Sequence, residues 1–435
     1  MTATNKHRRR EGNVEAFSDF DGGSLELHSL EGSVLRGGVF RERVCHADGE
    51  LYDYSRHFCF GLTNYGTAAV TVEVLLGTDS AESLPDDPPL LYSGPAPDEE
   101  FVPTRLAGRT DRSYAYAFDV PLAAGETRVI ANYYFRDYDA MVRRFGEVGR
   151  RTDARVEVIG QSIEGRPLTM FSWTRPGPES NGRHVIVMTS AVHPPEPDML
   201  ATEAVMGHFD SDEGRRWLEQ CDFHIIPIAN PDGFVHGYSG CNAAQVNFYW
   251  VFRTDDPREA PEAFHLWEVL KRLKPTVYFD WHGYTFQTTG RHAAPYEKPV
   301  SLNHGSVVRA LVARMNDRVA AAGGGHRTRG FLTHAPSTLA PKLTAAYNTI
   351  TYAKYHLELR LGIARNRELA LQVVRAAIET LRDAPPRRAL LLQPHGDCPR
   401  DVRALVAWPL HNIWRAQIRK RLGIVWRAVV GKKNA

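Results

Sequence analysis

The sequence predicts an α/β domain preceded by an antiparallel β-sandwich. Residues 15–136 contain short alternating or aromatic-rich runs separated by turn residues, which is typical of a small sandwich. Residues 138–384 alternate apolar strands with helical segments, which is typical of a sheet covered by helices. Because a domain has about 150 residues, a chain of 435 residues has room for both domains and for a further segment at 385–435.

The sandwich is predicted from runs such as 57–62, 69–76 and 113–118. Between two of these runs, residues 79–104 hold six prolines and clustered acidic residues. Proline lacks the backbone N–H that a central strand donates, so we expect this stretch to be a long surface loop.

The α/β domain is predicted element by element from its hydrophobic periodicity. The expected strands are 155–160, 167–173, 184–192, 222–228, 276–281 and 350–359. The expected helices include 262–273, 305–321 and 366–382. Continuously apolar strands of this kind indicate a sheet that is covered on both faces.

Residues 385–435 form a basic tail. From Arg403 onward the tail has eight Lys or Arg residues and no acid. Its apolar residues recur at helical spacing, namely Leu410, Trp414, Ile418, Leu422, Val425 and Val429. The sequence therefore predicts a basic amphipathic helix, whose apolar face packs on the parent domain or binds a membrane surface or a partner protein.

The composition is that of a globular protein, and we expect a cytoplasmic location. A net charge of +2 gives no reason to expect a nucleic-acid partner. No run approaches the ~20 apolar residues of a membrane span, and residues 1–14 lack the apolar core of a signal peptide. The five cysteines are scattered without a Cys-x-x-Cys pair, so we expect them to be reduced and structural.

A metal site is predicted where the apolar run Val185–Val192 ends in His193-Pro194-Pro195-Glu196. The same His-x-x-Glu spacing occurs at His28–Glu31 and His265–Glu268, so the spacing alone is not diagnostic. The copy at His193–Glu196 differs from the other two because a strand precedes it and a helical segment follows it. Since parallel sheets place ligands at the carboxyl ends of their strands, we predict His193 and Glu196 as metal ligands.

A third ligand and a base are expected at the ends of two other strands. Catalytic zinc typically has three protein ligands, and His282 follows the apolar run that ends in Asp280-Trp281. Glu358 lies in a third strand-like segment and is the candidate base. Two histidines and a carboxylate suit several divalent ions, among which zinc is the one we expect.

The order and spacing of four segments resemble the zinc metallocarboxypeptidase family. These segments are His193–Glu196, Ile226–Gly233, Asp280–Gly283 and Leu357–Arg360. In the sandwich, Phe17–Gly23 and Ala131–Phe135 are similar to the cytosolic carboxypeptidase branch of that family. The resemblance covers residues 15–382 and implies a mixed sheet of about eight strands with helices on both faces.

The resemblance also implies one zinc ion per chain and a role for each matching residue. His193, Glu196 and His282 would hold the zinc. Glu358 would act as general base and then general acid while a zinc-bound water attacks an amide bond. The implied activity is removal of C-terminal residues from peptides or proteins. Asn230–Gly233 would chiefly shape a turn.

The chain departs from the family pattern around the substrate. Gly240 stands where the family has an arginine for the oxyanion, and Tyr249-Trp250 replace an Asn-Arg pair that binds the substrate carboxylate. Arginine is suited to bidentate carboxylate binding, and an aromatic pair is not. Asn247 stands where an aspartate orients the first zinc histidine. The candidates to supply a guanidinium are Arg253, Arg360 and Arg365.

The sequence is compatible with three functions. The first is a zinc-dependent peptidase whose pocket is lined by Phe248, Tyr249 and Trp250. The second is a deacylase or amidase on a non-peptide substrate, because an aromatic pocket favours apolar groups. The third is a non-catalytic zinc-containing binding protein, because loss of one oxyanion donor costs roughly 100- to 1000-fold in rate.

Overall fold

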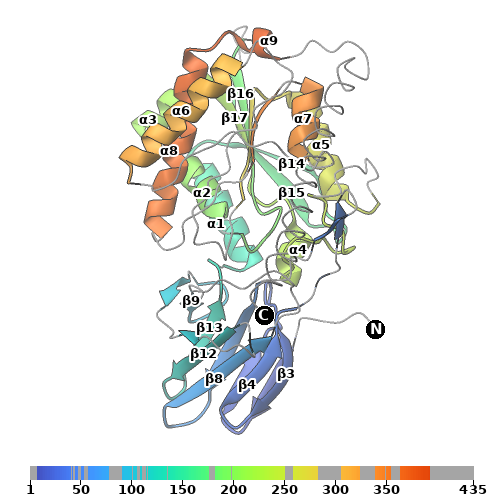
Figure 1. Cartoon of the computed structure of the whole chain (residues 1–435), viewed down its shortest axis with the longest axis vertical. Coiled ribbons are helices and arrows are strands. Elements are labelled where there is room, and N and C mark those ends of the chain that lie inside the picture. The colour runs from blue at the N-terminus through green and yellow to red at the C-terminus, as the bar shows by residue number, and fades with distance from the viewer. Residues whose placement is uncertain are drawn as a thin grey trace, which may run out of the picture.

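The computed structural model of the chain consists of a β-sandwich next to an α/β domain (Figure 1). The structure describes residues 7–40, 42, 45–47, 50–52, 57–77, 91–99, 101–104, 108–109, 114, 116–134, 136–175, 182–196, 198–249, 258–282, 305–323, 339–347, 349–353 and 363–391. Within these ranges no helix has both the length and the apolar character to cross a membrane.

Two sheets pack face to face in the sandwich. One has the strand order β1-β2-β7-β13-β9-β10 and the other the order β11-β12-β8-β4-β3. Their strands are β1 Arg8–Glu11, β2 Val14–Phe17, β3 Glu26–Glu31, β4 Val34–Gly38, β7 Cys59–Asn64, β8 Val70–Gly77, β9 Leu91–Gly94, β10 Val102–Thr104, β11 Gly108–Arg109, β12 Tyr116–Leu122 and β13 Thr127–Ala131. Side chains from both sheets form one buried cluster, in which Phe60 and Leu62 of β7 lie with Val72 and Val74 of β8.

The described strands of the sandwich pair antiparallel, with one exception. β4 and β8 run parallel, from Val34 opposite Glu73 to Gly38 opposite Gly77. A parallel pair needs a long crossover, and here the chain between the two strands forms β5 Cys45–Ala47, β6 Glu50–Tyr52 and β7. The predicted antiparallel sandwich is therefore confirmed apart from this pair.

The prediction of one long loop at 79–104 is wrong in its second half. β9 and β10 lie in this range and belong to the first sheet, where β9 pairs with β13. Leu91 and Tyr92 are each 1% exposed, so they contribute to the core. Pro103 is tolerated because β10 is the edge strand of its sheet.

The α/β domain contains a mixed sheet with the order β14-β15-β17-β16-β18-β19. These strands are β14 Arg155–Gln161, β15 Pro167–Trp173, β16 His184–Thr189, β17 Cys221–Ile226, β18 Val277–Asp280 and β19 Ile350–Ala353. The last four in the sheet order are parallel, whereas β14 and β15 join antiparallel. The six strands expected from the sequence are confirmed, with the end of the last one outside the described residues.

Helices cover both faces of this sheet (Figure 1). One layer holds α1 Tyr138–Arg151, α2 Met199–His208, α3 Asp212–Gln220, α6 Gly305–Ala321 and α8 Ile363–Arg382, and the other holds α5 Pro261–Leu273 and α7 Leu339–Tyr347. Two short helices are α4 Pro231–His236 and α9 Arg387–Leu390. Neighbouring residues of a strand point to opposite faces of the sheet. Ile186 and Phe279 pack in the hydrophobic core under the five-helix layer, whereas Val187 and Tyr278 pack in the core under α5 and α7.

The domain boundaries 15–136, 138–384 and 385–435 stay predictions. The basic helix expected from Arg403 onward lies outside the described residues, which end at residue 391.

Candidate metal centre

The predicted ligands follow two neighbouring parallel strands. β16 and β18 pair directly, and Thr189 at the end of β16 lies opposite Asp280 at the end of β18. His193 comes four residues after Thr189, and His282 comes two residues after Asp280. Because both strands end at the same edge of the sheet, the two histidines emerge side by side.

The loop after β16 is held by its own backbone and by a buried aspartate. Ala191 has a positive φ of 50°, which bends the chain just before His193. Asp198 is fully buried, and its Oδ2 accepts a hydrogen bond from the backbone N–H of Ala191 at 3.0 Å. The N–H of Glu196 donates to the carbonyl of His193 at 3.0 Å, which closes a turn between the two predicted ligands.

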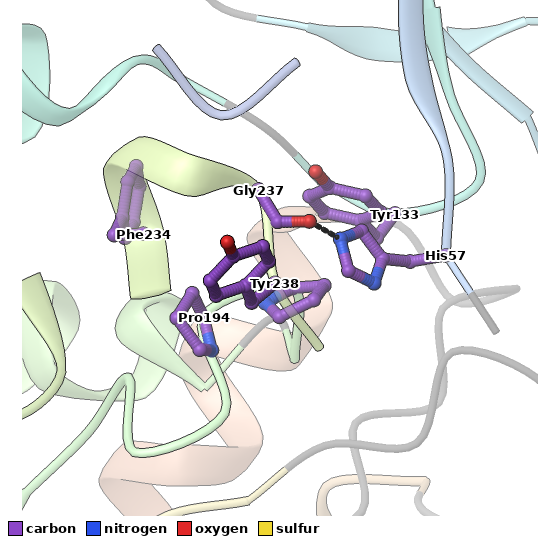
Figure 2. Close-up of a pocket in the computed structure, with 7 residues that line it drawn as sticks. His57, Tyr133, Pro194, Phe234, Gly237 and Tyr238 are labelled. Carbon is purple, nitrogen blue, oxygen red and sulfur yellow. Dashed lines mark hydrogen bonds between the residues drawn. The ribbon is translucent and has the colours of Figure 1, made fainter. Parts of the chain in front are cut away.

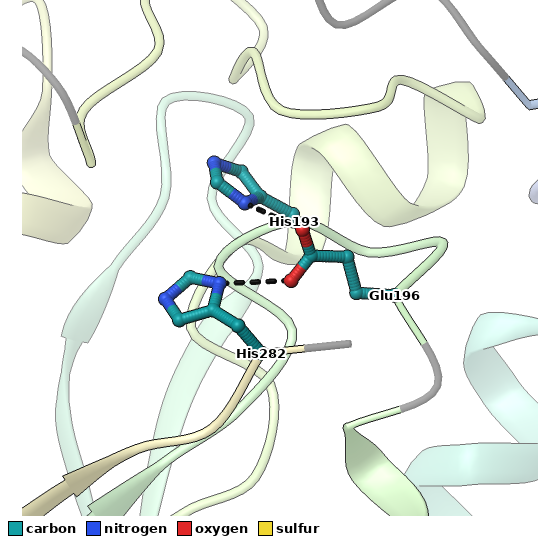
Figure 3. Close-up of side chains that lie close together, drawn as sticks. All are labelled: His193, Glu196 and His282. Atoms are coloured by element: carbon teal, nitrogen blue, oxygen red, sulfur yellow. Dashed lines mark hydrogen bonds and ion pairs between the residues drawn. The ribbon is translucent and has the colours of Figure 1, made fainter. Parts of the chain in front are cut away.

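Three side chains converge at this edge of the sheet (Figure 3). His193, Glu196 and His282 each offer a ligand atom, and these atoms lie within 4.8 Å of one another. Nδ1 of His193 is 3.2 Å from Oε1 of Glu196, and Nδ1 of His282 is 2.8 Å from Oε2. Both histidines are almost completely buried, at 2% and 1% exposed. Two imidazoles and one carboxylate are the donor set of several catalytic zinc sites.

The second nitrogen of His282 faces another carboxylate. Nε2 of His282 is 3.2 Å from Oδ1 of Asp280, which also accepts a hydrogen bond from Oγ1 of Thr189 at 3.3 Å. Metal-binding histidines usually donate their other ring N–H to such a partner, which fixes the tautomer and the ring plane. Nε2 of His282 makes no aligned hydrogen bond among the described residues, so Asp280 is suited to orient His282 through its charge at this distance.

The electrostatics of the cluster favour positive charge at its centre. Burial by itself would raise the pKa of Glu196, but the charges of His193 and His282 hold that pKa far below its usual range. Burial by itself would lower the pKa of His282, but Asp280 and Glu196 raise that pKa well above its usual value. A divalent cation competes with protons for the same donor atoms.

Gly240 lies close to both Asn247 and His193. A Cβ atom built on Gly240 would lie 2.6 Å from Nδ2 of Asn247 and 2.9 Å from Cδ2 of His193. Asn247 is 1% exposed, and its Oδ1 has no hydrogen-bond partner among the described residues. Amide oxygen and nitrogen are assigned from their surroundings, and turning the amide would offer Oδ1 to the His193 side of the site. The role of Asn247 in orienting His193 stays a prediction.

Tyr249 packs on both histidines. Its ring centre is 5.2 Å from that of His193 and 4.7 Å from that of His282, in edge-to-face arrangements. Tyr249 is 3% exposed, so it forms a wall of the cluster. Phe248 is 1% exposed and lies in the hydrophobic core beside α5 and α7. Tyr249 belongs to the same core and, in addition, packs its ring on both histidines.

Several predicted site residues lie outside the described residues. These are Glu358, Trp250, Arg253 and Arg360. Arg365, the third arginine considered, is described, and its Nη2 would lie 2.6 Å from a Cβ built on Gly323 at the end of α6. Of the other His-x-x-Glu copies, His28 is exposed on β3 and His265 contacts the backbone at Gly160.

The Asn-Pro-Asp-Gly segment has the structural role expected from the sequence. Asn230 caps α4 by accepting from the N–H of Gly233 at 3.0 Å. Its Nδ2 donates to the carbonyls of Val192 at 3.2 Å and Cys241 at 3.1 Å. Asn230 therefore fastens the loop that carries His193 to the loop that carries Gly240.

The sandwich contributes two residues that the sequence did not single out. Glu42 accepts hydrogen bonds from the backbone N–H groups of Ser239, Gly240 and Cys241, and His57 bonds to Ser239 Oγ and to the carbonyl of Gly237. Burial raises the pKa of Glu42 to about 7 although these N–H groups lower it. No motif marks either residue, and the partners are far away in the sequence.

A small pocket lies where the two parts of the chain meet (Figure 2). His57 and Tyr133 of the sandwich line it together with Phe234, Gly237 and Tyr238 around α4. Its remaining wall is formed by Pro194-Pro195, the two residues between the predicted ligands. The sandwich thus reaches the loop that joins the predicted ligands His193 and Glu196.

Residues 149–250 match the family model described as zinc carboxypeptidase. The α/β domain that contains this stretch is named the carboxypeptidase domain after this similarity. The match includes His193, Glu196 and the segment with Gly240, and the resemblance expected from the motifs is confirmed.

Curated relatives are 24% to 31% identical to the chain over the aligned stretches. A metallocarboxypeptidase A-like protein of Trichophyton verrucosum is 24% identical over 48% of the chain, and cytosolic carboxypeptidase 1 of Xenopus laevis is 31% identical over 30%. The alignments cover 57% and 12% of those two proteins. An inactive metallocarboxypeptidase of Saccharomyces cerevisiae is 28% identical over 27% of the chain and 31% of its own length.

Solved structures share the fold over most of the chain. A metallo-carboxypeptidase from Burkholderia cenocepacia superposes with a TM-score of 0.70 at 17% identity, over 86% of this chain and 99% of that one. A metallo-carboxypeptidase from Pseudomonas aeruginosa gives 0.66 at 17% identity, over 84% and 100%. Because the superposition extends beyond the carboxypeptidase domain, the sandwich is part of the shared architecture.

Proposed function

We propose that the protein is a zinc-dependent hydrolase of amide bonds that removes C-terminal residues from peptides or proteins. The observation that carries this proposal is the cluster of two buried imidazoles and one carboxylate within 4.8 Å, at the ends of two parallel strands. The match of residues 149–250 to the zinc carboxypeptidase model supports the same chemistry.

The residues present fit a zinc ion. Nδ1 of His193 and Nδ1 of His282 face the two oxygens of one carboxylate, and Asp280 faces the remaining nitrogen of His282. In this proposal His193, Glu196 and His282 hold the metal, Asn247 orients His193, and Asp280 orients His282. When bound, zinc supplies Lewis-acid polarisation of a carbonyl and of water.

The other residues of the proposed mechanism act by position and proton transfer. Glu358 accepts a proton from the attacking water and passes it to the leaving amine. Tyr249 excludes water from the inner side of the two histidines, because its buried ring packs on both. Together with Trp250 and Arg253, Tyr249 is proposed to contact the substrate.

The Gly240 position favours a second candidate, a zinc-containing binding protein without turnover. A Cβ at this position would lie only 2.6 Å from Asn247, so the space that the family gives to an arginine side chain is filled here. The yeast relative named as inactive shows that the family includes such members. Loss of an oxyanion donor leaves a metal site intact while it lowers the rate by about 100- to 1000-fold.

A deacylase or amidase that acts on a non-peptide substrate is the remaining alternative. An aromatic wall such as that of Tyr249 suits an apolar acyl group better than a free carboxylate. Carboxypeptidase substrates end in a charged carboxylate, and the two functions therefore differ in the end group that is accepted.

Digestion of a mixed peptide library, read by mass spectrometry, separates these candidates. The library contains peptides that end in acidic, aromatic and blocked residues, and it is treated with wild type and Glu358→Gln, each with and without chelator. We expect wild type alone to trim carboxyl termini and to lose this activity with chelator. An intact library in all four samples, with one metal retained per chain, would instead establish a binding protein or redirect the search to acylated small molecules.

The location and the tail complete the proposal. We expect the protein to act in the cytoplasm, with the basic helix from Arg403 onward binding the parent domain, a membrane surface or a partner protein. Deleting residues 403–435 and measuring partition onto vesicles with anionic lipid tests the membrane role, and unchanged partition would exclude it.

A further inference from the structure

A carboxylate of the sandwich lies inside a loop of the carboxypeptidase domain. Glu42 is 4% exposed, and its Oε2 accepts from the N–H of Gly240 at 3.0 Å and from the N–H of Cys241 at 2.9 Å. Its Oε1 accepts from the N–H of Ser239. Three successive N–H groups that converge on one anion form a backbone nest, which is a strong and directional carboxylate site.

A second residue of the sandwich holds the start of the same loop. His57 is 4% exposed, and its Nε2 donates to the carbonyl of Gly237 at 2.6 Å (Figure 2). Its Nδ1 bonds to Oγ of Ser239. With Nε2 as the donor, Nδ1 accepts from the serine hydroxyl, so a neutral imidazole satisfies both contacts. The loop is therefore fixed at both ends from outside its own domain.

On the side away from Glu42, this loop lies against His193, a predicted metal ligand. A Cβ on Gly240 would lie 2.9 Å from Cδ2 and 3.4 Å from Nε2 of His193. The same atom would lie 2.6 Å from Nδ2 of Asn247. The backbone of Gly240 is thus held between Glu42 on one side and the His193–Asn247 pair on the other.

We propose that Glu42 is a positioning residue for the metal centre, acting through the Ser239–Cys241 loop on His193. This inference rests on the proposed metal site and adds the sandwich to it. Replacing the carboxyl group of Glu42 by an amide releases the nest, because the amide presents an N–H₂ group to backbone donors that need an acceptor. The loop then moves away from His193 and the imidazole loses its fixed orientation. Outer partners of metal ligands typically change affinity by about 10- to 100-fold.

The test compares Glu42→Gln with Glu15→Gln in the full-length chain. Glu15 is a matched control, because it is an 8% exposed carboxylate of the same sandwich but is bonded to Arg8 and Tyr65. The readouts are Zn²⁺ affinity by competition with a chromophoric chelator, the visible spectrum of the Co²⁺-loaded protein, and amide exchange at residues 239–241. We expect Glu42→Gln to weaken Zn²⁺ binding about tenfold or more, alter the Co²⁺ bands and speed exchange, and Glu15→Gln to do none of these.

The outcomes are distinguishable. Unchanged Zn²⁺ affinity and Co²⁺ spectrum in folded Glu42→Gln would overturn the positioning role and leave the proposed function standing. Absence of Zn²⁺ binding in wild type would overturn the proposed function and this role with it. If Glu42→Gln does not fold, Glu42→Asp keeps the charge but withdraws the carboxylate from the N–H groups of residues 239–241 by one methylene group. Weaker Zn²⁺ binding and altered Co²⁺ bands in this variant support the positioning role, and unchanged values overturn it.

Discussion

At the scale of single residues, the candidate centre depends on partners that do not touch the metal. Asp280 faces His282, and Gly240 lies so close to Asn247 and His193 that a Cβ atom at this position would meet both. Such partners set the tautomer and orientation of the ligands. Substitutions at these positions should therefore change metal affinity without removing a ligand.

The first residue-scale prediction concerns Asp280. Asp280→Asn removes the carboxylate from Nε2 of His282, so the imidazole becomes a weaker ligand and Zn²⁺ affinity falls by about 10- to 100-fold. Isothermal titration with Zn²⁺ measures this change. Asp222→Asn is the control, because Asp222 is also buried but pairs with Arg183 at the start of β17. Equal affinities for both variants would contradict the role of Asp280.

The second residue-scale prediction concerns Gly240. Gly240→Ala forces Asn247 and His193 apart, because the new methyl group would lie 2.6 Å and 2.9 Å from them. We expect lower stability and weaker Zn²⁺ binding. In α1, Gly146→Ala meets only a side-chain atom at 3.8 Å and should stabilise the protein by about 0.5–1 kcal/mol. Chemical denaturation measures both, and a stabilised Gly240→Ala would show that the loop yields.

The sequence predicts the three candidate ligands, which the structure brings together, but it predicts only some of the residues around them. His193 and His282 each follow an apolar strand, and strand ends in a parallel sheet meet at one edge. Asn247 was recognised by its place after a motif. Glu42 could not be predicted from the sequence, because the backbone N–H groups to which it bonds are far away in the chain. Ser239 is 197 residues from Glu42, and no local pattern indicates such a contact.

At the scale of elements, the central sheet is specified by continuous apolar runs. Each residue of β16, β17 and β18 is buried. These strands therefore lack the alternation of apolar and polar residues, and their continuous apolar runs make them easy to recognise in the sequence. The β9 and β10 strands were missed because Pro103 in β10 and the prolines and acidic residues between the two strands are typical of loops. The parallel pairing of β4 with β8 was also missed, since strand direction depends on the path of the connection.

The central strands also carry buried histidines that make stability depend on pH. Burial lowers the pKa of His184 on β16 and of His224 on β17 to about 4, below the ordinary value of 6.5. On acidification the unfolded chain binds protons first, so stability is lost as the pH falls from 6.5 toward 4. The loss is up to ~3 kcal/mol per histidine.

Denaturation of wild type and His224→Gln at several pH values measures this effect. The glutamine keeps a polar contact with Ser172, whose Oγ is 2.9 Å from Nδ1 of His224, but it does not titrate. We expect a smaller loss of stability between pH 7 and pH 4.5 in the variant. Substitution of the exposed His28 serves as the control, and a pH dependence that His224→Gln leaves unchanged would refute the assignment.

At the scale of the whole molecule, the sandwich and the carboxypeptidase domain share buried polar contacts. The N–H of Gly22 donates to the carbonyl of Val235 at 2.9 Å, and Glu42 and His57 hold the adjacent loop. Breaking a buried contact of this kind costs the desolvation of both partners. The sequence predicted two domains but not this junction, since its residues come from distant segments without a shared motif.

We therefore predict that the two parts unfold together. Scanning calorimetry of the full-length chain should give one transition whose calorimetric and van't Hoff enthalpies agree. Glu42→Gln should lower the midpoint of that transition, because a buried carboxylate contact is lost. Two well-separated transitions in wild type would contradict this coupling.

The most direct test of the central claim is the zinc content of the purified chain after saturation and dialysis. Wild type should retain one zinc per chain, and the double variant His193→Ala with His282→Ala should retain none. A second double variant, His28→Ala with His265→Ala, changes the other two His-x-x-Glu copies and should keep the full zinc content. Absence of zinc in wild type, or retention of zinc without His193 and His282, would contradict the assignment of this cluster as the metal centre.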